Sequence, residues 1–73
     1  MATATLTVPD ISCEHCERTV RSALTPLHGV REVGVDIPGK RVRVTYDESV
    51  VTVEELKQAL LRQDYPVASV DGP

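Results

Sequence analysis

The sequence predicts an α+β fold in which one antiparallel sheet carries two helices on one of its faces. Three segments alternate apolar and polar residues, which is the period of a strand, and a short run near the end of the chain supplies a fourth strand. Two other segments repeat apolar residues every three or four positions, which is the period of a helix. Because the alternation leaves one strand face polar, the sheet should bury only its other face. The order β-α-β-β-α-β is that of the ferredoxin-like βαββαβ sandwich.

A short break should separate the first strand from the first helix. Residues 3–8 alternate apolar side chains with threonines, and a Pro-Asp pair at 9–10 ends this strand. The helix that follows should end near residues 24–25, because Pro26 removes a backbone donor. A His-Gly pair at 28–29 then turns the chain. The apolar stripe of this helix consists of Cys16, Val20, Ala23, Leu24 and Leu27.

A hairpin should form the next two strands. Residues 33–37 and residues 42–46 both alternate apolar and polar side chains. Between them, Pro38 and Gly39 suit the two central positions of a type II turn, in which the second residue has positive φ. We therefore expect an antiparallel pair closed by this turn.

A second helix and a short last strand complete the chain. Thr52 and Glu55 form a capping box, which marks the start of a helix. After Asp64, residues 66–70 should form the last strand. No linker or repeat divides the chain, so we expect residues 1–73 to be a single domain. The buried stripe of the second helix consists of Val53, Leu56 and Leu60.

Composition argues against two classes of partner. The chain has eight basic and eleven acidic residues, a net charge of −3, and only two aromatic side chains. Binding to nucleic acid requires a basic stripe and usually aromatic stacking platforms. Docking on an anionic membrane surface likewise requires positive charge. We therefore expect neither nucleic-acid binding nor membrane insertion.

The start of the chain predicts a location. Residues 1–8 lack the basic start and the continuous apolar run of a secretory signal. No segment has the length of a membrane span. We therefore expect a cytoplasmic protein, in which the two cysteines stay reduced and indicate a metal or redox site.

The chemistry should lie at Cys13 and Cys16, which are spaced as CxxC. The first should lie on the loop after the first strand and the second in the first turn of the helix, so that both sulfurs point at one place. Free N–H groups and the positive end of the helix dipole stabilise thiolates there. We expect that neither thiol is needed to build the core.

The spacing alone leaves three kinds of site open: a zinc half-site, a redox dithiol and a soft-metal clamp. A structural zinc site needs four ligands, and His28 is followed by no second histidine. A thioredoxin-type centre usually has an aromatic residue where this chain has Ser12. Cu(I) is soft and is satisfied by two thiolates, so it fits this ligand set best.

Three side chains near the cysteines, those of Ser12, His15 and Tyr65, are candidates for auxiliary roles. His15 is expected to be exposed at the helix start and not a primary ligand, although it could become a third ligand in a dimer or change the cysteine pKa values. Tyr65 could cover the sheet edge or lie beside the metal and its sulfurs. His28 is expected to be a solvated turn residue.

The sequence resembles the heavy-metal-associated domain family and, within it, the small bacterial copper chaperones. The resemblance covers nearly the whole chain. It rests on the Cys-Glu-His-Cys motif at 13–16, the Gly-Val pair at 29–30, the strand Val-Arg-Val-Thr-Tyr-Asp at 42–47, and Asp-Tyr-Pro-Val at 64–67.

The resemblance implies a function and partners. It implies that Cys13 and Cys16 bind Cu(I) and pass it to a partner domain of the same fold, so the protein would be a metallochaperone and not an enzyme. The partner would be the amino-terminal domain of a copper-transporting P-type ATPase, or a copper-sensing repressor. Ser12 favours copper, because members that prefer zinc, cadmium or lead often have an acidic residue there. The loop of Tyr65 would lie beside the metal loop, and a copper-bridged homodimer is also expected.

Other functions remain open at this point. The chain could be a metal-binding domain of a larger transporter, or a binder of zinc or mercury. It could also be a thiol oxidoreductase, or a structural or regulatory module whose cysteines have no function.

Two positions depart from the family pattern. Ile11 stands where the family usually has a methionine that packs under the loop, and isoleucine should keep that packing role. Asp64 stands where a glycine often precedes the tyrosine, and aspartate tolerates positive φ better than most residues.

Overall fold

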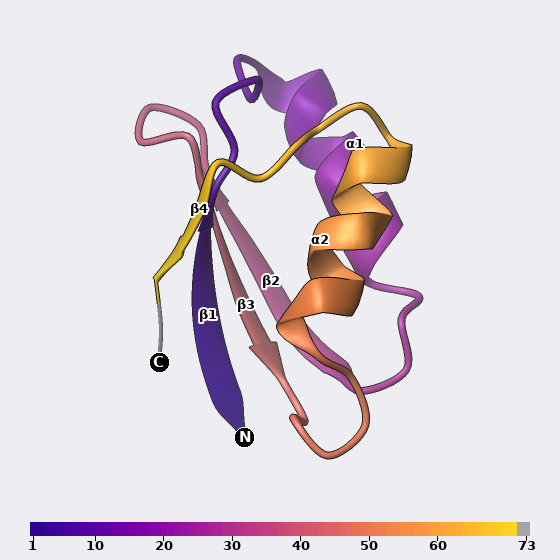
Figure 1. Ribbon diagram of the computed structural model, residues 1–73. Coiled ribbons are helices and arrows are strands. Elements are labelled where there is room, and N and C mark those ends of the chain that lie inside the picture. The colour runs from indigo at the N-terminus through magenta and orange to yellow at the C-terminus, as the bar shows by residue number, and fades with distance from the viewer. Residues whose placement is uncertain (72–73) are drawn as a thin grey trace.

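The computed structural model describes residues 1–71, which form one sheet and two helices. Both helices lie on the same face of the sheet, and the other face is open (Figure 1). The α+β, ferredoxin-like arrangement expected from the sequence is confirmed. The elements are β1 (Ala2–Thr7), α1 (Glu14–Leu24), β2 (Val30–Asp36), β3 (Arg41–Tyr46), α2 (Val53–Arg62) and β4 (Ser69–Asp71).

The strand order β2-β3-β1-β4 decides which loops meet. Every pairing is antiparallel, and β1 lies between β3 and β4. Thr7, at the end of β1, therefore pairs with Arg41 at the start of β3 and with Ser69 at the start of β4. As a result, the loop after β1, the β2–β3 turn and the segment before β4 come together at one end of the molecule (Figure 1).

The core lies between the helices and the covered face of the sheet. Alternating residues of β1 and β3 enter it, as the strand pattern predicts. Cys16 is also part of it, with 7% of its surface exposed. The place of Cys16 on the apolar stripe of the helix is therefore confirmed, and the expectation that the core does not need either thiol stays a prediction. The buried residues are Ala4, Leu6, Val8, Ile11, Cys16, Val20, Leu24, Val42, Val44, Tyr46, Val51, Leu56, Ala59 and Leu60.

The last strand is shorter than predicted and begins later. It was expected at 66–70 and spans Ser69–Asp71. Pro66 has no backbone N–H and cannot donate to a neighbouring strand. The Ala68 amide makes the first backbone hydrogen bond to β1, to the Thr7 carbonyl at 2.8 Å.

The β2–β3 turn also differs from the prediction. Positive φ falls on Lys40 (55°) and not on Gly39, so the turn is not type II. The Lys40 amide donates to the Ile37 carbonyl at 3.1 Å and closes the turn. A Cβ at Gly39 would lie 2.5 Å from a carboxylate oxygen at the end of the exposed Asp36 side chain, which can move aside at little cost.

The second helix begins as the capping box predicts. The Thr52 hydroxyl accepts a hydrogen bond from the Glu55 amide at 3.2 Å. This bond satisfies one of the amides that the first helical turn leaves without a partner. Neither helix of the described chain is both long and apolar enough to cross a membrane.

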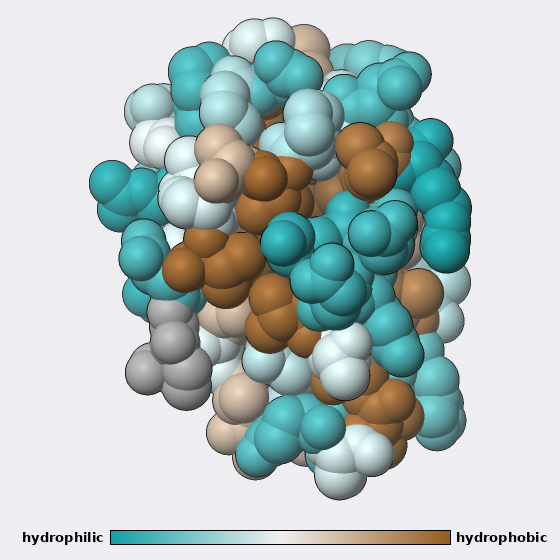
Figure 2. Space-filling view, viewed as in Figure 1, coloured by the Kyte–Doolittle hydropathy of each residue, from teal (hydrophilic) through white to brown (hydrophobic). Residues whose placement is uncertain are grey.

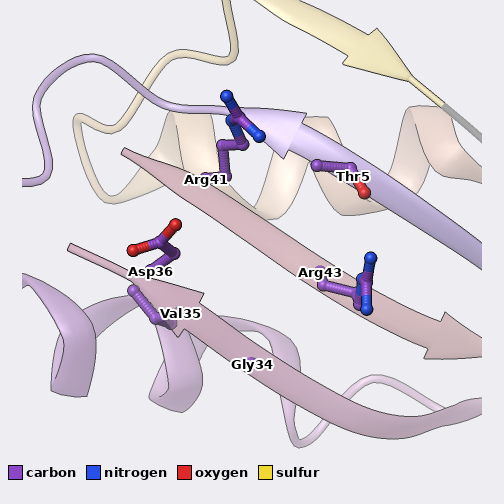
Figure 3. A pocket seen from close by; sticks show the side chains of 6 residues that line it. All are labelled: Thr5, Gly34, Val35, Asp36, Arg41 and Arg43. Atoms are coloured by element: carbon purple, nitrogen blue, oxygen red, sulfur yellow. The ribbon is translucent and has the colours of Figure 1, made fainter. Parts of the chain in front are cut away.

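The open sheet face is polar and hollowed. Figure 3 shows Arg41 and Arg43 projecting from β3 beside Thr5 of β1. These side chains border a hollow of about 380 Å³, whose remaining lining residues are Gly34, Val35 and Asp36. Neither cysteine lines it. The cysteines instead lie at the start of α1, at one end of the sandwich.

Candidate metal centre

Cys13 and Cys16 lie at the junction between the β1–α1 loop and α1, as predicted. Cys13 is the N-cap residue, with an extended backbone (φ −160°, ψ 175°) and an exposed side chain. Cys16 lies in the first helical turn and is buried. Their sulfurs are 3.7 Å apart. One thiol of the pair is thus fixed in the core and the other faces solvent.

The helix start leaves donors free beside the thiols. The first backbone hydrogen bond of this turn runs from the Glu17 amide to the Cys13 carbonyl at 3.2 Å. No side chain caps the amides at this end. Unpaired amides and the helix dipole both favour negative charge at a helix start. The position is therefore suited to thiolates.

Ile11 anchors the loop before Cys13 to the core. Its side chain is fully buried, and its amide donates to the Val8 carbonyl at 3.2 Å. The expectation that isoleucine keeps the packing role is confirmed. Asp10 and Ser12, on either side of Ile11, are exposed.

The Cys16 sulfur has close neighbours in this loop. The Ser12 hydroxyl lies 3.8 Å from it, and the Asp10 carbonyl oxygen, also at 3.8 Å, can accept from the thiol only while Cys16 is protonated. Ser12 thus lies beside this sulfur, and the auxiliary role expected for it stays a prediction.

The Cys16 thiol is acidic. Its pKa is lowered to about 6, first by hydrogen bonding from the Tyr65 side chain and then by the backbone of Ser12. Burial acts in the opposite direction, while the side chains of Ser12 and Cys13 lower the pKa further. The same hydrogen bond raises the pKa of Tyr65, as do its burial and the neighbouring cysteine charges. Near neutral pH, Cys16 is therefore a thiolate with a protonated tyrosine beside it.

The end of α2 brings Tyr65 to this sulfur. Asp64 has φ of 64°, and its amide donates to the Leu61 carbonyl at 3.0 Å. The Tyr65 amide donates to the Leu60 carbonyl, also at 3.0 Å. These two bonds define a Schellman motif, which ends a helix and turns the chain sharply. The expectation that Asp64 tolerates positive φ is confirmed, and Tyr65 is half-buried at the metal loop.

The histidines lie apart from the sulfurs. His15 is exposed and borders a groove between the two helices together with Arg18 and Gln63. His28 is exposed in the turn at the far end of α1, near Asp47. Within residues 1–71, no group of three or more His, Cys, Asp and Glu side chains is placed to hold a metal ion. The described residues therefore offer two thiols and no third ligand.

One contact at this loop was missed by the sequence analysis. The ammonium of Lys40 donates to the Ile11 carbonyl at 2.7 Å. A hydrogen bond between residues 29 positions apart has no periodicity that could reveal it. The signal available in the sequence was a lysine directly after the Pro-Gly pair of the hairpin.

Comparison with known proteins identifies the family. Residues 5–65 match the model of the heavy-metal-associated domain. The chain belongs to this family. Over 67 residues this heavy-metal-associated domain is 43% identical to the copper chaperone CopZ of Staphylococcus haemolyticus (strain JCSC1435), and the match covers 92% of the chain and 98% of the relative. Over 60 residues it is 45% identical to CopZ of Staphylococcus epidermidis (strain RP62A), covering 82% and 88%.

Solved structures of the same fold support the assignment. A CopZ metallochaperone superimposes with a TM-score of 0.88 at 38% identity, covering 90% of this chain and 98% of the other. Oxidized MerP from Ralstonia metallidurans CH34 also gives 0.88, at 35% identity, and covers 94% of each chain. The heavy-metal-associated domain described here thus keeps the family fold over nearly its whole length.

Proposed function

We propose that this heavy-metal-associated domain is a copper carrier in which Cys13 and Cys16 bind Cu(I) as thiolates. The observation that carries the proposal is the pair of sulfurs 3.7 Å apart at a helix start, one buried and one exposed. Relatives that match at 40–45% identity bear the name copper chaperone. Cu(I) is soft and accepts two thiolates without further ligands, which is what the described residues supply.

Transfer would proceed by exchange of thiolate ligands. A thiolate of the partner attacks the bound Cu(I) from the solvent side and forms a three-coordinate intermediate. The exposed Cys13 is then released and takes up a proton, and Cys16 follows as a second partner thiolate binds. The exposure of Cys13 supports this order, since an incoming group can reach the metal beside it. The ion leaves as Cu(I), as it arrived, and no substrate is converted to a product, so we propose a carrier and not an enzyme.

The same proposal extends to partners and location. We propose delivery to the amino-terminal domain of a copper-transporting P-type ATPase, with a copper-sensing repressor as a second recipient. Reduced thiols are required at every step, which fits a cytoplasmic location. We further propose that residues 1–73 act as one domain, because the family match spans residues 5–65.

One observation favours a second function, thiol oxidoreduction. A thiol with a pKa of about 6 next to another thiol is also what a redox dithiol requires. A redox titration in glutathione buffers would separate the two functions. A catalytic dithiol should cycle with a disulfide substrate, whereas a carrier should show no turnover.

The carrier proposal is tested by replacing each cysteine alone. Cys13→Ser and Cys16→Ser should both abolish tight Cu(I) binding, measured by competition with a chromophoric Cu(I) chelator. Circular dichroism should show that both variants fold, but Cys16→Ser should unfold at a lower temperature because its sulfur is buried. Cys13→Ser is the matched control for stability. Wild-type affinity in either variant would contradict the two-thiolate site.

Zinc and mercury are tested by the same kind of competition, and a transporter origin is tested by a transfer assay. Repeating the competition with Zn²⁺ and Hg²⁺ shows which ion the site retains at equal free concentration. A domain of a larger transporter would bind Cu(I) through the same two thiols. That alternative is tested by asking whether the chain delivers copper to an isolated ATPase domain or only receives it.

A further inference from the structure

The β2–β3 turn holds the metal-binding loop through a single residue, Lys40. The two segments lie side by side at one end of the molecule (Figure 1). The ammonium of Lys40 donates to the Ile11 carbonyl at 2.7 Å, and its own carbonyl accepts from the Val8 amide at 2.8 Å. The Ile11 amide in turn donates to the Val8 carbonyl at 3.2 Å. Lys40 therefore binds both ends of the four-residue turn that leads to Ser12 and Cys13.

Of these hydrogen bonds, the one from the Lys40 ammonium to the Ile11 carbonyl is the strongest. A hydrogen bond to an ionised donor is shorter and contributes more than one between neutral groups. No acidic side chain of residues 1–71 pairs with Lys40, so the Ile11 carbonyl is the partner of its ammonium. Ile11 is two residues before Cys13, and its side chain is fixed in the core. With the carbonyl also held, the direction in which the chain leaves Ile11 is set.

The backbone of Lys40 supports a role beyond the turn itself. Its φ of 55° lies in the left-handed region, where glycine is the favoured residue. The chain has its glycine one position earlier, at Gly39, where φ is not positive. Residues in strained conformations persist where the surrounding structure holds them, and they cluster at functional sites. Here the side chain that glycine would lack is the one that contacts the metal loop.

We propose that Lys40 is a positioning residue for the metal-binding loop: it fixes the Ile11 carbonyl and thereby the segment that carries Cys13. Loss of the ammonium should let this segment open while the sheet stays intact. The expectation that the hydrogen bond of Lys40 slows the escape of copper from the loop rests on the proposed function. The expectation that this bond keeps the loop closed does not rest on it, and can be measured on the metal-free protein.

Amide hydrogen exchange of the metal-free protein tests the hold directly. In Lys40→Met, exchange of the Ile11 amide should accelerate about tenfold, because loop opening no longer breaks a charged hydrogen bond. Exchange of the Val8 amide should stay the same, because it binds the Lys40 backbone carbonyl, which every variant keeps. Lys40→Arg retains a charged donor and should restore slow exchange at Ile11.

Two further variants separate positioning from stability. Lys40→Gly removes the ammonium and relieves the positive φ, so its unfolding temperature should fall less than that of Lys40→Met although Ile11 exchanges faster in both. Lys57→Met removes the same charge from α2, where Lys57 pairs with Glu54, and should leave Ile11 exchange unchanged. Unchanged Ile11 exchange in Lys40→Met overturns the proposal. So does equal acceleration at Ile11 and Val8, which would mean general unfolding.

The copper arm uses the same variants loaded with Cu(I). Capture of the ion by a chromophoric chelator should be about tenfold faster from Lys40→Met than from wild type or Lys40→Arg. If the wild type fails to bind Cu(I), the proposed function is wrong, and the exchange data still decide the role of Lys40. If the loop opens in Lys40→Met but capture is no faster, the positioning role does not extend to the metal.

Discussion

At the scale of single residues, the two cysteines have unequal surroundings. Cys16 is a core residue with a lowered pKa, held near Ser12 and Tyr65, whereas Cys13 is an exposed N-cap. The sequence predicted their placement on loop and helix, because CxxC followed by an apolar stripe fixes the helix start. It also predicted stabilised thiolates from the helix start, whereas the largest cause that lowers the pKa of Cys16 is the side chain of Tyr65, 49 positions later in the chain.

Replacing Tyr65 tests the origin of that acidity. Tyr65→Phe removes the hydroxyl and keeps the ring, so the pKa of Cys16 should rise toward 9.0, its ordinary value. A pH titration of thiolate ultraviolet absorbance in the metal-free protein measures the change. Ser12→Ala is the comparison variant and should produce a smaller rise, because only the weaker side-chain bond of Ser12 is lost. An unchanged titration in Tyr65→Phe would contradict the role assigned to the hydroxyl.

The same pKa predicts how the stability of the metal-free protein depends on pH. Between pH 6 and 9 the folded protein holds Cys16 as a thiolate, while the unfolded chain still binds that proton. The free energy of unfolding should therefore rise with pH across this window. The contribution of Cys16 to it should be lost as the pH falls toward 6. Urea unfolding at several pH values measures it. Cys16→Ser should flatten this rise, and a rise of full size in that variant would assign it to another group.

His15 is expected to contribute little to the affinity for Cu(I). It is exposed and is not part of any three-ligand group in the described chain. His15→Ala should leave the Cu(I) affinity of the monomer within about tenfold, or about 1.4 kcal/mol, of wild type. Chelator competition at low protein concentration measures this without interference from dimers. A loss of several orders of magnitude would show that His15 is a primary ligand.

At the scale of elements, the periodicities were sufficient for the helices and for three strands. They failed where backbone conformation depends on tertiary contacts. The Pro-Gly pair at 38–39 favours a type II turn locally, yet positive φ falls on Lys40, whose hydrogen bonds to Val8 and Ile11 lie outside the hairpin. The last strand begins late because Pro66 cannot pair and Ala68 makes the first bond to β1.

The C-terminal end of α2 offers a test at this scale. Asp64 holds the left-handed position of the Schellman motif that delivers Tyr65 to Cys16. Asp64→Gly should stabilise the protein by about 0.5–1 kcal/mol, because relief of the strained φ exceeds the entropic cost of glycine. Thermal and urea unfolding measure the change. Asp64→Val should destabilise the protein, because a β-branched side chain is poorly tolerated at positive φ, and a less stable Asp64→Gly would refute the strain argument.

At the scale of the whole molecule, the topology gathers the chemistry at one end. The loop of Cys13, the turn of Lys40 and the segment of Tyr65 meet there, while His28 lies at the other end. On the side seen in Figure 2, apolar side chains reach the surface between α2 and β4. Two large exposed apolar residues, Leu61 and Val70, belong to these elements. The metal end and this apolar area are two surfaces through which copies of the protein could associate.

The metal end should be the one that associates, and only with copper. A two-coordinate Cu(I) beside the exposed Cys13 can accept a further thiolate, and a second copy of the protein offers two. Formation of this dimer would be the transfer step with a second copy of the protein in place of the recipient. His15 and Tyr65 should lie near the shared face. Without metal, a net charge of −3 on each copy disfavours contact. Analytical ultracentrifugation across a Cu(I) titration should show a monomer that converts to a dimer and reverts when glutathione competes for the ion.

Two variants decide which surface holds that dimer. Cys13→Ser removes the exposed ligand and should stay monomeric at every copper ratio, because no second copy can share the ion. Leu61→Lys places a charge on the apolar area and should dimerise as wild type does, because the copper-bridged face lies elsewhere. A dimer that survives a strong Cu(I) chelator and is lost in Leu61→Lys would place the interface on the apolar area. Sedimentation as a monomer at every copper ratio, even at high protein concentration, would mean that bound Cu(I) is closed to a second copy; transfer would then require a partner that first opens the loop held by Lys40.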